Sequence, residues 1–185
     1  MAESISADAY LKGLNNAEKG ERGRSLLDLI ELKTFDLELA AWCTALVSGG
    51  ASYLAGSGPG GVGKTTTMHS LLSFVPQNLH FAAALPGEIS PSVGTPHCAI
   101  SHELSDHGPS SYLWDQNLRD FLALSEQGHL LTATAHADDL AEIHGQIVVT
   151  NQVPEEQFRS LNLLIFICLE GGNPPGRRVK DTETR

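Results

Sequence analysis

Short apolar runs alternate along this chain with stretches in which apolar residues recur every three or four positions. An uninterrupted apolar run is typical of a buried strand, and the wider spacing is typical of a helix with one buried face. The runs predict strands at residues 51–55, 80–85, 97–101, 130–135 and 161–169. The spaced stretches predict helices at residues 25–32, 36–48, 65–75, 117–127, 137–146 and 154–159. Strands that alternate with helices predict a three-layer α/β fold with a mostly parallel sheet.

The chain divides by composition into two parts. Residues 1–24 are polar and are interpreted as a frayed or loosely helical lead-in. Two helices follow, and the glycine pair Gly49-Gly50 ends the second of them. We therefore expect an N-terminal helical extension over residues 1–49 and one α/β domain over residues 50–185. A chain of 185 residues has room for one such domain and little more.

Charge narrows the range of partners. The chain has 12 basic and 22 acidic residues, a net charge of −10, and its only lysines and arginines between residues 33 and 177 are Lys64, Arg119 and Arg159. Three cations cannot form a basic face, so we expect no direct binding to nucleic acid or to an anionic membrane surface. The sequence has no apolar run of about 18 residues and no secretory leader pattern, which predicts a soluble, cytoplasmic protein.

One glycine-rich segment carries a phosphate-binding pattern. It lies between the strand at 51–55 and the helix at 65–75 and fits G-x-x-x-x-G-K-[ST] in full. The segment and the threonine after it comprise Gly58, Pro59, Gly60, Gly61, Val62, Gly63, Lys64, Thr65 and Thr66. Glycine lets successive backbone N–H groups turn toward a phosphate, and the helix N-terminus faces the same anion. We expect Lys64 to be mobile and solvated and to bind the β- and γ-phosphates of ATP, while Thr65 binds Mg²⁺.

The glycine-rich segment alone is compatible with several classes of ATPase. It resembles the loop of partitioning ATPases, although Pro59 stands where those proteins carry a signature lysine, and its start, G-P-G, resembles loops of AAA+ proteins. Residues 128–136, G-H-L-L-T-A-T-A-H, resemble the histidine box of the secretion and type IV pilus ATPases. Residues 118–128 resemble the R-D, helix and glycine that precede this box, and residues 177–183 resemble the closing strands more loosely.

The resemblance covers about residues 50–185 and implies a RecA-like P-loop motor domain. It implies a Mg²⁺-dependent ATPase similar to the motors of type II and type IV secretion and of pilus assembly. A hexameric ring and contact with membrane-associated secretion or pilus components would follow. The sequence shows no counterpart of the large N-terminal domain of this family, which implies a reduced form.

A P-loop site also needs an acid at the end of a neighbouring strand, to hold Mg²⁺ through water. The family supplies it in a G-E pair before R-D, and residues 114–120 contain no such glutamate. Asp115 follows a short apolar run, and we expect it to take the place of this glutamate. An equal alternative is that Asp115 is the N-cap of the next helix. Glu88 is a further candidate, either polarising the attacking water or lying on the loop surface. Without the glutamate, a nucleotide-binding regulatory or structural subunit with little turnover is the alternative to an ATPase.

Four further residues belong to the predicted site or its surroundings. His136 ends the strand at 130–135 and would lie at the nucleotide crevice, where it could sense the γ-phosphate or hold a water. The resemblance assigns His129 to the nucleotide site, whereas the residues alone favour a packed turn histidine. Arg119 could reach the γ-phosphate of a neighbouring subunit or pair with an acid on its own helix. Local pairing is the role we expect for Arg159.

Histidines and acids also gather between residues 97 and 107. His97, His102 and His107 stand near Glu103 and Asp106. Their spacing matches no standard metal site, so we interpret this segment as a polar loop.

Overall fold

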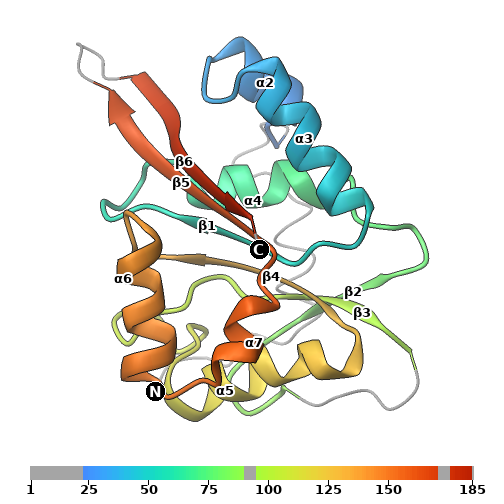
Figure 1. Ribbon diagram of the computed structural model, residues 1–185, viewed down its shortest axis with the longest axis vertical. Coiled ribbons are helices and arrows are strands. Elements are labelled where there is room, and N and C mark those ends of the chain that lie inside the picture. Colours follow the sequence, from blue (N-terminus) through green and yellow to red (C-terminus); the bar gives the residue numbers. More distant parts are fainter. Residues whose placement is uncertain (1–22, 90–94, 171–175, 185) are drawn as a thin grey trace.

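The computed structural model describes residues 23–89, 95–170 and 176–184. Within these residues the strands form one sheet in the order β2-β3-β4-β1-β5-β6 (Figure 1). The strands are β1 (Tyr53–Gly56), β2 (His80–Ala83), β3 (His97–Ile100), β4 (Leu130–Ala135), β5 (Leu163–Glu170) and β6 (Gly176–Thr184). The first five are mutually parallel, and β6 pairs with β5 in the antiparallel sense. The predicted mostly parallel sheet is therefore confirmed.

Helices cover both faces of the sheet (Figure 1). One layer contains α2 (Leu26–Glu31), α3 (Leu37–Ser48) and α4 (Lys64–Leu72). The other contains α5 (Asp115–Ala123) with the 3-10 turn Leu124–Gln127, α6 (Leu140–His144) with the π-helical turn Gly145–Thr150, and α7 (Glu155–Arg159). Along β1, Tyr53 and Ala55 pack in the α2–α4 layer and Leu54 packs against the α5–α7 layer. Because successive side chains of this fully buried strand face opposite helix layers, the fold is a three-layer α/β sandwich.

The two N-terminal helices begin where the sequence predicts. Ser25 caps α2 through a capping box with Asp28, and Asp36 caps α3 by accepting a hydrogen bond from the backbone N–H of Leu39. After α3, Gly50 adopts a left-handed φ of 92° that turns the chain into β1. Leu26, Leu29, Cys43 and Val47 share a core with Met68 and Leu71 of α4, so α2 and α3 complete the layer that α4 begins. Residues 1–22 of the lead-in predicted over residues 1–24 lie outside the described residues.

The carboxyl ends of the central strands bring three chain segments together. β4 lies beside β1, and β3 lies beside β4. The glycine-rich segment follows β1, residues 101–103 follow β3, and residues 136–138 follow β4. In open parallel sheets this edge, where the connections diverge to opposite sides, is where ligands bind. Among the described residues, no helix is long and apolar enough to cross a membrane.

Candidate functional site: a glycine-rich loop with a buried lysine and glutamate

The glycine-rich segment forms a turn that only glycine accommodates at two positions. Gly61 has φ 73° and Gly63 has φ 118°, both in the region that side chains disfavour. Between them, Val62 is 2% exposed and anchors the loop in the protein. Gly63 is the N-cap of α4 and provides no side-chain cap, so the N-terminal N–H groups of this helix face the loop. This arrangement is suited to hold an anion.

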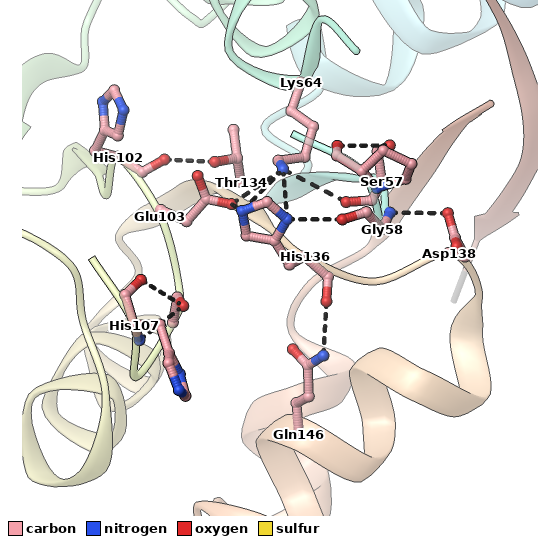
Figure 2. A network of polar contacts seen from close by, with 12 residues as sticks. Ser57, Gly58, Lys64, His102, Glu103, His107, Thr134, His136, Asp138 and Gln146 are labelled. Carbon is pink, nitrogen blue, oxygen red and sulfur yellow. Dashed lines mark hydrogen bonds and ion pairs between the residues drawn. The ribbon is translucent and has the colours of Figure 1, made fainter. Parts of the chain in front are cut away.

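Lys64, the first residue of α4, is buried rather than solvated. It is 6% exposed, and its Nζ lies 3.2 Å from Glu103 Oε1, 3.1 Å from His136 Nδ1 and 3.4 Å from the Ser57 carbonyl oxygen (Figure 2). The expectation of a mobile, solvated lysine is therefore wrong. The ammonium instead pairs with the carboxylate of Glu103, which lies three residues beyond β3.

Glu103 is the acid that faces this lysine, and the sequence assigned it only to a polar loop. It lies three residues beyond β3, where Leu104 N–H donates to the Thr134 carbonyl at 2.8 Å and Leu113 N–H donates to the Glu103 carbonyl at 3.0 Å. These bonds extend β3 toward β4 and direct the carboxylate inward, where Glu103 is 5% exposed. The signal in the sequence was its place as the first acid after the strand at 97–101. Glu103 lies outside residues 114–120, where the family resemblance predicts the acid.

His136 lies between Lys64 and the loop, where its position at the end of β4 predicts it. Its Nδ1 lies 2.9 Å from the Gly58 carbonyl oxygen, which can only accept, and 3.1 Å from the Lys64 ammonium, which can only donate. Its Nε2 lies 3.5 Å from Lys64 Nζ and 3.4 Å from Glu103 Oε1. The Gln146 side chain donates to the His136 carbonyl at 2.7 Å and fixes the backbone (Figure 2). Lysine, glutamate and histidine thus converge from three different strand ends.

The oxygen atoms at this edge are of the kind that Mg²⁺ binds. Among the described residues, Glu103 Oε1 is buried and accepts no hydrogen bond, although it lies within ion-pair distance of Lys64, and Ser101 Oγ is also buried without one. Thr65 follows Lys64 in the first turn of α4 and contributes a hydroxyl. Carboxylate and hydroxyl oxygens fit a hard divalent cation. The described residues contain no group of three or more His, Cys, Asp or Glu side chains placed to hold a metal ion.

Asp115 and Glu88 lie elsewhere on the surface. Asp115 is exposed, is the first residue of α5 with φ 49°, and donates its backbone N–H to Asn151 Oδ1 at 2.8 Å. The N-cap of α5 is Trp114, so Asp115 does not fill the capping role either. Glu88 is exposed in the turn after β2, with its N–H donated to the Leu85 carbonyl. Neither carboxylate has a contact with Lys64 among the described interactions, whereas the carboxylate of Glu103 does.

The two arginines make local contacts. Arg119 donates to the Asn151 carbonyl at 2.9 Å and to the Gln116 side chain at 3.1 Å, which ties α5 to the turn before α7. Arg159 donates to Glu155 one helical turn earlier, at 3.2 Å, in agreement with the local pairing predicted for it. For Arg119 this geometry also favours a local role.

His129 immediately precedes β4 and therefore lies at the edge of the sheet opposite the glycine-rich loop. Its Nδ1 accepts from the His97 backbone N–H at 3.0 Å, and the two rings stack with centroids 5.8 Å apart. Burial and the neighbouring His97 lower the pKa of His129. This placement does not fit contact with a nucleotide and favours the packed turn histidine.

The remaining histidines of the polar segment have separate surroundings. His102 stacks on Tyr112 with centroids 5.6 Å apart, and burial lowers its pKa. His107 contacts Asp106 at the surface. Beside His136, a cavity of about 500 Å³ is lined by Leu104, Ser105, Asp106, His107, Trp114, His136, Gln146 and Thr150.

Comparison with known proteins shows the fold. No protein-family model matches the sequence. No curated protein matches it either. Among solved structures, the chain is similar to the VirB11 ATPase of the Brucella suis type IV secretion system, solved in complex with sulphate, with a TM-score of 0.54 and 17% sequence identity. The likeness covers 96% of this chain and 61% of the VirB11 chain. The likeness supports the three-layer α/β fold, and the chain spans about three fifths of the length of the protein it resembles.

Proposed function

We propose that this chain binds ATP with Mg²⁺ at the glycine-rich loop and hydrolyses it, in the manner of a secretion or pilus-assembly ATPase. The observation that carries the proposal is the buried pair of Lys64 and Glu103, 3.2 Å apart. A lysine at the end of a glycine-rich loop and an acid at the end of a neighbouring strand are the two charged groups that phosphoryl transfer requires. A buried ion pair is weak support for stability, so a functional reason for it is the better explanation.

Each residue of the site then has a distinct task. The N–H groups of the loop and of the first turn of α4 bind the phosphate oxygens, and Lys64 leaves Glu103 to neutralise the β- and γ-phosphates. Thr65 and, through water, Glu103 would hold Mg²⁺, which screens the phosphate charge. Glu103 orients the attacking water and accepts its proton. His136 lies beside Lys64 and would contact a γ-phosphate oxygen once Lys64 has moved.

The alternative of a regulatory subunit without turnover loses its main support. That alternative depended on the absence of a glutamate from residues 114–120. Glu103 supplies the acid, with 7% of its side chain exposed and its carboxylate directed at Lys64. A shielded carboxylate of this kind is suited to proton transfer in a site from which water is excluded.

Binding and turnover are tested separately. Isothermal titration with Mg-ATP measures binding, and phosphate release measures turnover, for the wild type and for the variants Glu103→Gln and Glu88→Gln. We expect Glu103→Gln to bind ATP and to lose turnover by at least about a hundredfold, because the amide cannot accept the proton. Glu88→Gln, at an exposed acid, is the matched control and should behave like the wild type. Absence of ATP binding by the wild type would refute the proposal. Binding without turnover would support the alternative, a nucleotide-binding regulatory or structural subunit.

The proposal includes assembly. In ring ATPases a cation of a neighbouring subunit stabilises the γ-phosphate, and the local contacts of Arg119 leave this role to another residue of a neighbouring copy. We therefore propose a homo-oligomer, a hexameric ring in a motor, that works with membrane-associated secretion or pilus components. Light scattering with and without Mg-ATP tests this, and a monomer at high concentrations of protein and nucleotide would contradict it.

A further inference from the structure

The segment after β4 lies directly across the start of the glycine-rich loop. Ser57 N–H donates to the Ala135 carbonyl at 3.2 Å, which continues the pairing of β1 with β4 by one residue. A Cβ on Gly56 would lie 2.8 Å from the Ala137 carbonyl oxygen, so the two backbones approach more closely than a side chain permits. The loop therefore leaves β1 against a fixed surface formed by residues 135–138.

The Gly58 residue is held by two side chains of that segment. Its N–H donates to Asp138 Oδ1 at 2.8 Å, and its carbonyl oxygen lies 2.9 Å from His136 Nδ1 (Figure 2). A Cβ on Gly58 would lie 2.4 Å from Asp138 Oδ2. Gly58 does not have a left-handed φ, so the requirement for glycine at this position comes from the Asp138 carboxylate and not from the backbone.

The first turn of α6 fixes Asp138 in turn. Its backbone N–H donates to Glu142 Oε2 at 2.8 Å. Asp139 caps the helix by accepting from the Glu142 N–H at 2.9 Å. Asp138 is therefore attached to a helix start at one end and to the glycine-rich loop at the other.

We infer that Asp138 is a positioning residue of the phosphate-binding loop. Its hydrogen bond to Gly58 fixes the position of the first residue of the loop. The position of Gly58 in turn fixes the arrangement of His136 and Lys64 around the phosphates. This inference rests on the proposed nucleotide site. Asp138 is exposed and has no contact with Lys64 among the described interactions, so it acts only through the loop.

The expected effect is on phosphate binding. Loss of one charge-assisted hydrogen bond at a partly solvated position corresponds to about tenfold weaker binding. The loop holds the phosphates in the ground state and in the transition state alike, so the KM for ATP should rise about tenfold while kcat changes less than about threefold. Asp138→Asn keeps an acceptor oxygen for the Gly58 N–H and removes a negative charge near the triphosphate. It should bind Mg-ATP at least as tightly as the wild type.

The experiment compares Asp138→Ala and Asp138→Asn in the full chain, by titration with Mg-ATP and with pyrophosphate and by steady-state turnover. Asp139→Ala is the matched control, because it weakens the start of α6 without removing the Gly58 contact. A KM increase in Asp138→Ala alone, restored by Asp138→Asn, supports the inference. Equal KM values in Asp138→Ala and the wild type, or an equal increase in Asp139→Ala, overturn it while leaving the proposed function intact.

Thermal unfolding tests the contact without nucleotide. Gly58→Ala should lower the melting temperature, and Gly58→Ala with Asp138→Ala should restore it, because the three atoms nearest to the added Cβ all belong to that carboxylate. A double variant as unstable as Gly58→Ala would contradict the inference. If the wild type bound neither Mg-ATP nor pyrophosphate, the proposed function would fail and this role of Asp138 with it, even where the contact itself is verified.

Discussion

Lys64 Nζ and Glu103 Oε1 lie 3.2 Å apart, with 7% of each side chain exposed. The two residues come from opposite sides of β4, the lysine from the loop after β1 and the glutamate from the extension of β3. Removal of either residue of such a buried ion pair is costly, because the charge of the other residue then remains buried without a partner. The site is therefore coupled to the stability of the fold.

Removal of the lysine alone should destabilise the protein. Lys64→Met leaves the Glu103 carboxylate buried without a cation and should lower the free energy of unfolding by about 3–5 kcal/mol. Lys64→Met with Glu103→Gln removes both charges and should recover most of that loss. Urea denaturation of the two single variants and the double variant measures the coupling. Additive losses would show that the two side chains do not interact.

The Mg²⁺ dependence of ATP binding should follow Glu103 and not Asp115. Asp115 is exposed at the start of α5, so Asp115→Asn should leave the enhancement of ATP binding by Mg²⁺ unchanged. Glu103→Gln should reduce the enhancement, because the cation loses its nearest fixed anion. Titrations with ATP in the presence and absence of Mg²⁺ compare the two variants. A reduction in Asp115→Asn alone would restore the assignment that the sequence favoured.

Arg119 should matter for stability more than for turnover. Its guanidinium donates to the Asn151 carbonyl at 2.9 Å, and Arg119→Ala leaves that carbonyl without its donor. We expect a loss of about 1–2 kcal/mol in the free energy of unfolding and less than about a threefold change in kcat. Thermal unfolding and phosphate release measure both quantities. A large loss of turnover with unchanged stability would indicate an arginine that acts on the γ-phosphate of a neighbouring subunit.

Stability should fall as the pH decreases from about 6.5 toward 4. Burial, with a smaller contribution from His102, lowers the pKa of His69 to about 4, below its ordinary value of 6.5. The unfolded chain therefore takes up a proton first as the pH falls, and the folded state loses up to about 1.4 kcal/mol per pH unit in that interval. His69→Gln should flatten this slope. Denaturation midpoints between pH 4 and 7 test it, and an unchanged slope in the variant would contradict the assignment.

The sequence by itself determined the glycine-rich loop and the order of β1 to β5 and of the helices along the chain, whereas its apolar runs did not predict β6. Hydrophobic spacing is a local property, so the runs at 51–55, 80–85, 97–101, 130–135 and 161–169 match β1 to β5 within a few residues. The need for glycine at Gly61 and Gly63 is local too, because it arises from the backbone angles of the turn. His136 was placed correctly for a similar reason, since it directly follows a predicted strand that ends at the same edge as β1.

Only the tertiary structure decided which acids meet the loop. Glu103 and Asp138 reach Lys64 and Gly58 because β4 pairs with both β1 and β3, and the order of strands in a sheet is not written in any local pattern. Asp115 and Glu88 had equally suitable positions after apolar runs, yet their segments lead to the surface. The burial of Lys64 was likewise unpredictable from its neighbours, because desolvation depends on the segments that close over a side chain and these come from distant parts of the chain.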